Sequence, residues 1–96
     1  MGVAIRFTKS AGRHNITQAD ALYALTHAVN TQHIEGRDGQ PTRVFVGRPH
    51  AQSRRYIEVI VAVIHTGDIV VFHAMELTNA WRHLVYEAGH TEWENE

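Results

Sequence analysis

The feature that most constrains the fold is the segment Tyr56–Ile64, which carries apolar residues at both odd and even positions. Because side chains alternate between the two faces of a strand, a segment that is apolar on both faces is typical of a strand inside a sheet. Thr66, Gly67 and Asp68 follow as a tight turn, and Ile69–Met75 has the pattern of the next strand. The middle of the chain therefore predicts a β-hairpin whose first strand is central in its sheet.

The segments on either side of this hairpin complete an α+β fold. Thr17 and Asp20 have the spacing of a capping box, which predicts a helix that begins there and continues to about Asn30. The apolar face of this helix consists of Leu22, Leu25, Ala28 and Val29. We expect Thr78 to cap a second helix, which Gly89 ends. The other expected elements are strands at Val3–Phe7 and Thr42–Arg48, a further short strand near His33–Glu35, and a loop at Arg48–Arg55. The order β-α-β-β-β-α predicts an antiparallel sheet packed on the helices.

Length and composition are those of one small domain. The chain has 96 residues, of which 44% are hydrophobic and 20% are charged, so we expect a single core within residues 1–96. Residues 89–96 are rich in glutamate, and we expect them to form a flexible acidic tail. No apolar run approaches the roughly 18–20 residues that span a bilayer, and cysteine is absent. These features favour a cytoplasmic protein without a membrane segment.

Two polar residues within the predicted hairpin are the first candidates for chemistry. Glu58 lies in the first strand and His73 in the second. A two-residue turn within Thr66–Asp68 pairs His73 with either Ile60 or Ala62. Both registers place Glu58 and His73 on one face, away from the helix side, whereas a three-residue loop without a bulge separates them. A carboxylate and an imidazole on an open sheet face are suited to proton transfer, or else form a polar cross-strand pair without catalysis.

A cationic loop leads into the predicted central strand. Its basic residues are Arg48, His50, Arg54 and Arg55. Arginine binds phosphate through paired hydrogen bonds, so Arg48, Arg54 and Arg55 are the expected contacts to RNA phosphates. Tyr56 follows the loop and is suited to stacking on a base. The alternative is a solvent-exposed hairpin loop without such a role, and the overall net charge of −1 does not by itself indicate a nucleic-acid-binding protein.

Eight histidines raise the question of a metal site. The sequence contains neither an H-x-x-x-H pair nor an HExxH motif. His65 and His73 are expected on opposite faces of the hairpin, so they do not form a ligand pair. Gly67 is interpreted as a turn glycine rather than part of a phosphate-binding loop. The sequence therefore predicts no metal site and no cofactor, and a metal-dependent or small-molecule enzyme is the least favoured reading.

Three short motifs between Arg13 and Glu87 carry a resemblance to a known family. The segment Arg13–Thr17, RHNIT, is similar to a K-H-G-[VI]-S turn that leads into a first helix. The segment Ile57–Thr78, IEVIVAVIHTGDIVVFHAMELT, is similar to a long hairpin that ends in an I-[IS]-A-R-x-[AS]-[TS] motif, and a short helix follows it. On these motifs the chain resembles the BrnT-like toxins of the RelE superfamily.

The resemblance implies the toxin of a type II toxin–antitoxin system. Such a protein is a small, metal-independent endoribonuclease that inhibits growth by cutting RNA, and it forms a hetero-oligomer with a DNA-binding antitoxin. The arginine of the family's hairpin motif falls at Met75 in this chain. Either Glu58 and His73 supply the catalytic base and acid, in an order that the sequence leaves open, or the domain is a catalytically inactive module that acts through a protein partner.

Overall fold

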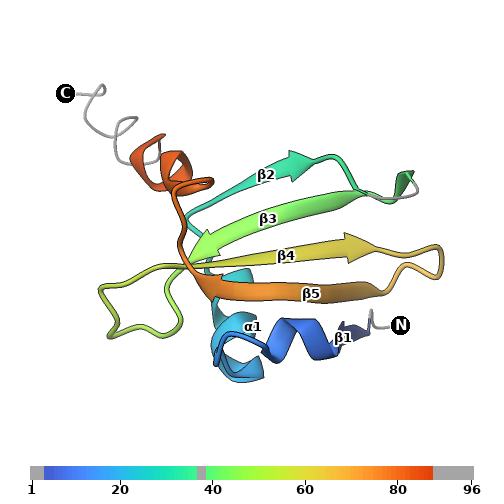
Figure 1. Cartoon of the computed structure of the whole chain (residues 1–96), viewed down its shortest axis with the longest axis horizontal. Coiled ribbons are helices and arrows are strands. Elements are labelled where there is room, and N and C mark those ends of the chain that lie inside the picture. The colour runs from blue at the N-terminus through green and yellow to red at the C-terminus, as the bar shows by residue number, and fades with distance from the viewer. Residues whose placement is uncertain (1–3, 37–38, 88–96) are drawn as a thin grey trace.

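Five strands form one sheet in the order β1-β5-β4-β3-β2 (Figure 1). The computed structural model describes residues 4–36 and 39–87, so the predicted tail at 89–96 lies outside the described residues. The elements are β1 (Ile5–Phe7), the 3-10 helix η1 (Lys9–Gly12), α1 (Gln18–Thr26), β2 (Asn30–Ile34), β3 (Thr42–Gly47), β4 (Ile57–Val63), β5 (Ile69–Glu76) and a helical segment over residues 82–87. Neighbouring strands from β2 to β5 are antiparallel, whereas β1 adds to β5 in parallel, so the α+β prediction is confirmed with a mixed sheet. Within the described ranges, the helices are too short or too polar to cross a membrane.

The β4–β5 hairpin places Glu58 and His73 on one face, as predicted, but with a turn length that was not predicted. The turn has three residues, because the N–H of Ile64 donates to the carbonyl of Asp68 at 3.0 Å. Gly67 closes this turn with a φ of 90°. Further along, the pairing shifts by one residue at a β-bulge, so that Phe72 has no partner on β4. The bulge reverses the change of face that the three-residue turn introduces, and His73 pairs with Ile60.

The first helix begins where its capping residue predicts but ends earlier. The side chain of Thr17 accepts a hydrogen bond from the N–H of Asp20, and α1 begins at Gln18. The helix ends at Thr26, and Asn30 already belongs to β2. The helix therefore ends four residues, about one helical turn, before the predicted end.

The face of α1 that packs on the sheet matches the predicted one at Leu25, which contacts the core, but not at Leu22. Ala21 and Ala24 are buried, whereas Leu22 and Val29 remain 39% and 42% exposed. A Cβ on Gly47 of β3 would lie only 2.8 Å from the carbonyl oxygen of Ala24. The small residues on both sides let the helix backbone approach the strand closely, and this contact selects the alanine face.

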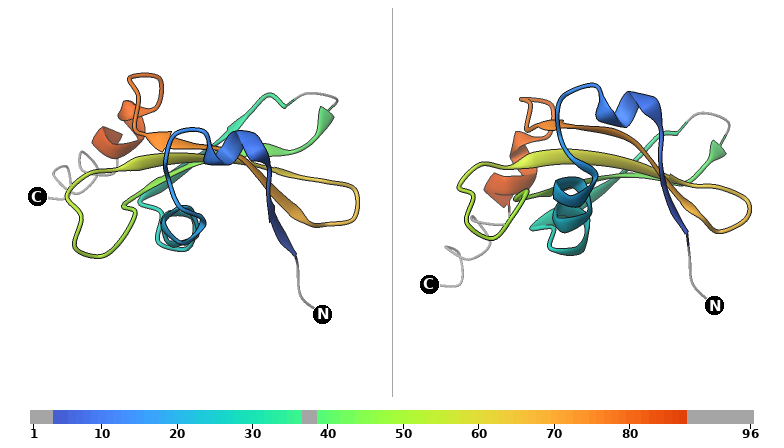
Figure 2. Two further views of the ribbon diagram at one scale, coloured as in Figure 1. Left: turned by 60° about the horizontal axis from the view of Figure 1, so that its bottom comes forward. Right: turned by 90° about the horizontal axis from the view of Figure 1, so that it is seen from below.

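The two helical segments lie on opposite faces of the sheet. Figure 2 shows α1 below the sheet and the chain that follows β5 above it in the left-hand view. The core under α1 contains Ala11, Ala21, Ala24, Ile57, Val59, Val61, Val71 and Ala74. The core on the other face contains Val44, Val46 and Leu84, with Tyr56, Ile60, Leu77, Trp81 and Val85 packed against it. The prediction that the Glu58 face is open is therefore wrong near Glu58, because residues 77–87 fold back over that end of the sheet.

Candidate functional site

Glu58 and His73 form a direct hydrogen bond. Glu58 pairs with Met75 in the sheet and His73 pairs with Ile60, so the two side chains are diagonal neighbours on one face. The distance between Nε2 of His73 and Oε2 of Glu58 is 2.8 Å. The Glu58 side chain is 3% exposed and the His73 side chain is 27% exposed. The pair therefore consists of a buried carboxylate and an imidazole that reaches the surface.

The second oxygen of Glu58 is held by Thr78. Both the backbone N–H and the Oγ1 hydroxyl of Thr78 donate to Oε1, at 2.8 and 2.7 Å. The prediction that Thr78 caps the second helix is wrong, since its hydroxyl is engaged by the carboxylate and the helical segment starts at residue 82. Three hydrogen bonds offset the cost of burying this carboxylate.

The hydrogen bonds of Glu58 also determine which nitrogen of His73 carries a proton. An ionised carboxylate only accepts hydrogen bonds, so Nε2 is the donor in this pair. In the neutral ring Nδ1 is then the acceptor, and it has no hydrogen-bond partner among residues 4–36 and 39–87. The partly exposed ring of His73 therefore has one nitrogen bonded to the carboxylate and a second nitrogen that can accept a hydrogen bond from an incoming group.

His14 lies next to His73, although the two residues are far apart in the sequence. Their ring centroids are 5.9 Å apart, with the ring planes at 63°. The turn that carries His14 is fixed by η1, since the Ser10 hydroxyl donates to the carbonyl of Phe72 at 2.8 Å and Ala11 is buried. Sequence reasoning did not place His14 in the site, although the motif RHNIT contains it. The site therefore presents two imidazoles side by side.

The cationic loop reaches the same end of the sheet, but its arginines differ in their surroundings. The guanidinium carbon of Arg48 lies 5.5 Å from the centroid of the Tyr56 ring. Arg55 forms an ion pair with Glu76 at 2.9 Å. Arg54 is exposed, and no partner for its side chain occurs in the described part of the chain. The structure brings Tyr56 and Arg48 together, while an acidic neighbour offsets the charge of Arg55.

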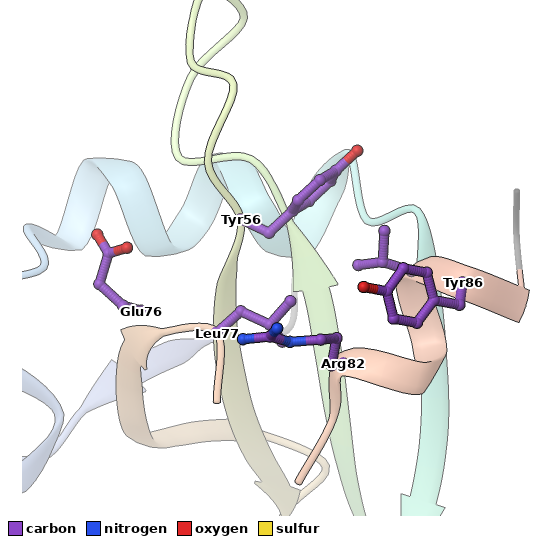
Figure 3. A pocket seen from close by; sticks show the side chains of 6 residues that line it. Tyr56, Glu76, Leu77, Arg82 and Tyr86 are labelled. Atoms are coloured by element: carbon purple, nitrogen blue, oxygen red, sulfur yellow. The ribbon is translucent and has the colours of Figure 1, made fainter. Parts of the chain in front are cut away.

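A pocket of about 290 Å³ opens beside Tyr56 (Figure 3). It is lined by Tyr56, Glu76, Leu77, Arg82, Val85 and Tyr86. Arg82 and Tyr86 were not predicted as site residues, because only the fold-back of residues 77–87 brings them to the start of β4. This pocket therefore lies between Tyr56, which follows the cationic loop, and the helical segment over residues 82–87.

A larger groove of about 600 Å³ lies at the other end of the same face. Its lining residues are Ile34, Glu35, Gly36, Gln40, Thr42, Ile60, Ala62, Ile64, Val70 and Phe72. Ile60 and Phe72 also flank His73, since Ile60 is its partner across the hairpin and Phe72 precedes it. The site of the two histidines is therefore bordered by an aromatic and cationic pocket on one side and a largely apolar groove on the other.

The geometry offers no ready metal centre within residues 4–36 and 39–87, where no three histidine, aspartate or glutamate side chains are grouped as ligands. Comparisons with protein-family models, with curated proteins and with solved structures find no match.

Proposed function

We propose that this chain is a metal-independent endoribonuclease of the toxin type, in which His73 and His14 act on the RNA and Glu58 positions His73. The observation that carries this proposal is the buried carboxylate behind a surface imidazole, 2.8 Å from it, with a second imidazole alongside. A carboxylate behind a histidine fixes the ring tautomer and stabilises the imidazolium that forms when the ring accepts a proton. Glu58 is too deeply buried to contact RNA itself, so it works through His73.

The chemistry is transfer of the phosphoryl group to the RNA's own 2′-hydroxyl. Nδ1 of His73 takes the proton of the 2′-hydroxyl, and the 2′-oxygen at the same time forms a bond to the adjacent phosphorus. The bond from phosphorus to the 5′-oxygen breaks, and protonated His14 donates a proton to that oxygen. The products are a 2′,3′-cyclic phosphate and a 5′-hydroxyl. General acid–base catalysis of this kind contributes about 10²–10⁴-fold each time a positioned group transfers a proton.

The arginines of the cationic loop provide the electrostatic part of this activity. Arg48 and Arg54 are exposed, and we assign them contacts with phosphates of the bound RNA strand near Tyr56. Arg55 contributes less, because Glu76 is already its partner. Contacts of this kind hold the strand in position without reading its sequence.

A toxin of this type is neutralised by an antitoxin, which is the proposed protein partner of this chain. A DNA-binding antitoxin forms a hetero-oligomer with the toxin by inserting an apolar segment into the groove that contains Ile60 and Phe72. This groove borders His73, so an inserted segment covers the proposed site and blocks RNA. An Ile34→Glu variant places a charge at the far wall of the groove; it should escape neutralisation by the co-expressed antitoxin and retain cleavage.

Growth and cleavage assays test the proposal directly. Expression of the wild-type chain should arrest growth, and the purified protein should cut single-stranded RNA in excess EDTA. His73→Ala should abolish both effects, whereas His65→Ala, at an exposed position in the hairpin turn, should retain them. Cleavage that requires a divalent metal, or full activity of His73→Ala, would overturn the assignment.

A second candidate function is a binding module that acts on a protein partner without cutting RNA. Two observations favour it: Met75 occupies the position of the arginine that the family resemblance implies, and a largely apolar groove of about 600 Å³ lies beside His73. This alternative predicts that His73→Ala still arrests growth and that Ile34→Glu does not. The proposed ribonuclease predicts the reverse.

A further inference from the structure

We infer that the pocket between Tyr56 and Tyr86 binds one unpaired base of single-stranded RNA. The inference rests on the proposed function, and it specifies the substrate as RNA whose bases are free to stack. The pocket lies outside the pair of histidines, so it acts in binding rather than in proton transfer.

The lining of the pocket combines flat aromatic surfaces with positive charge. Figure 3 shows that Tyr56 and Tyr86 enter from different elements, while the Arg82 side chain runs from the helical segment toward Leu77. Tyr86 is 65% exposed, so its ring is accessible to a ligand that enters the pocket. An aromatic pair of this kind provides stacking surfaces for a base of any sequence.

The charges around the pocket favour a nucleotide over an uncharged aromatic ligand. Arg82 lines the pocket, and Arg48 lies against the Tyr56 ring. The carboxylate of Glu76 is paired with Arg55 and points away from the two tyrosine rings in Figure 3. Two arginines beside two aromatic rings match the combination of a base and its phosphate.

The position of the pocket relative to His73 fits an RNA strand that crosses both. Ile60 is the partner of His73, and Tyr56 lies four positions before Ile60 in the sequence. At about 3.3 Å per residue, this places Tyr56 roughly 13 Å from the histidine along the strand direction. The bound base therefore belongs to a nucleotide near the cleaved linkage but not at it.

Binding of a non-cleavable RNA tests this inference apart from catalysis. The probe is a fluorescently labelled 2′-O-methyl hexanucleotide, which lacks the attacking hydroxyl, and the readout is its anisotropy. Tyr86→Ala should weaken binding about 5- to 100-fold, as expected for the loss of one stacked base. Tyr86→Phe should bind as the wild type does, because the ring is retained. Arg82→Ala should also weaken binding, while Tyr23→Ala serves as the control, because α1 packs on the other face of the sheet and Tyr23 does not line the pocket.

The outcomes separate this inference from the proposed function. Loss of affinity in Tyr86→Ala, with recovery in Tyr86→Phe and an unchanged thermal midpoint, supports the base site even if no RNA is cleaved. Equal affinity of Tyr86→Ala and wild type overturns the base site even if His73-dependent cleavage is observed. Equal affinity for the hexanucleotide and for a duplex of the same sequence also overturns it, because paired bases are not free to enter the pocket.

Discussion

At Glu58 a buried carboxylate determines the position of a proton on its neighbour. In a Glu58→Gln variant, the amide oxygen still accepts from Thr78, but the amide nitrogen now donates to Nε2 of His73. The ring proton of His73 then moves to Nδ1, which no longer accepts a proton from the 2′-hydroxyl. We predict a loss of RNA cleavage of about 10²–10⁴-fold, with a cooperative thermal transition retained.

Nitrogen-15 NMR of the imidazoles checks the tautomer in this variant. The wild type should show a proton on Nε2 of His73, and Glu58→Gln should show it on Nδ1. Full activity of Glu58→Gln with the proton still on Nε2 would contradict the positioning role. His14→Ala provides a comparison, since it should lose cleavage without any change in the tautomer of His73.

Thr78 donates two hydrogen bonds to Oε1 of Glu58, the carboxylate oxygen that His73 does not contact. Thr78→Val removes the Oγ1 donor but keeps the shape of the side chain and the backbone N–H. The loss of one hydrogen bond to a buried carboxylate should lower the free energy of unfolding by about 1–3 kcal/mol. Thr26→Val at the exposed end of α1 is the matched control and should change it by less than about 0.5 kcal/mol. Chemical denaturation measures both, and equal effects would count against the contact.

At the level of elements, the hairpin between β4 and β5 decides whether the site exists. The three-residue turn alone would place His73 on the α1 face, and the bulge at Phe72 returns it to the face of Glu58. The turn depends on Gly67, whose φ is 90°. Two local irregularities therefore cooperate to form one hydrogen bond across the strands.

Two glycines that differ only in backbone conformation test the turn. A Cβ at either Gly67 or Gly12 meets no atom within 4 Å, but only Gly67 has a positive φ. Gly67→Ala should lower the free energy of unfolding by about 1–2 kcal/mol, the cost of the left-handed conformation for a residue with a Cβ. Gly12→Ala should have little effect. A thermal or denaturant midpoint compares them, and a tolerant Gly67 would mean that the turn adopts another conformation.

Most strands and the start of α1 were predictable because their signals are local. The two-sided apolar pattern identified β4 as central, and the spacing of Thr17 and Asp20 identified the first turn of α1. The end and the buried face of α1 were not predictable, because they depend on the close approach of Ala24 to Gly47, which are distant in the sequence. Local patterns cannot report such a contact.

The same distinction applies to the candidate site. Glu58 and His73 were predicted as neighbours from the alternation of side chains along a hairpin with a two-residue turn. The three-residue turn and the bulge that compensates for it were not predicted. The burial of Glu58, the approach of His14, and the pocket residues Arg82 and Tyr86 were not predictable, because each requires segments that are separated in the sequence to meet on the sheet.

At the scale of the whole molecule, the net charge is −1, so RNA binding depends on where the arginines lie and not on the total charge. Arg54→Ala should weaken RNA binding and reduce the slope of log affinity against log salt by about 0.7, the value for one phosphate contact of a single strand. Arg55→Ala should reduce the slope less, because Glu76 already pairs with Arg55. Titrations of the 2′-O-methyl hexanucleotide at several salt concentrations measure these slopes.

Arg6 on β1 is the control for this series, because it is an exposed arginine paired with Asp68 far from the cationic loop. Arg6→Ala should leave the salt slope unchanged. A slope that falls equally in the Arg6, Arg54 and Arg55 variants would indicate a diffuse charge effect and would contradict phosphate contacts at the loop.

The ends of the RNA fragments report most directly whether the two histidines carry out the proposed reaction. The purified protein is incubated with a single-stranded RNA in EDTA, and the products are identified by mass spectrometry. The wild type should yield a 2′,3′-cyclic phosphate and a 5′-hydroxyl, and His73→Ala should yield neither. Fragments that end in a 3′-hydroxyl and a 5′-phosphate, or the same products from His73→Ala, would contradict the proposed role of His73.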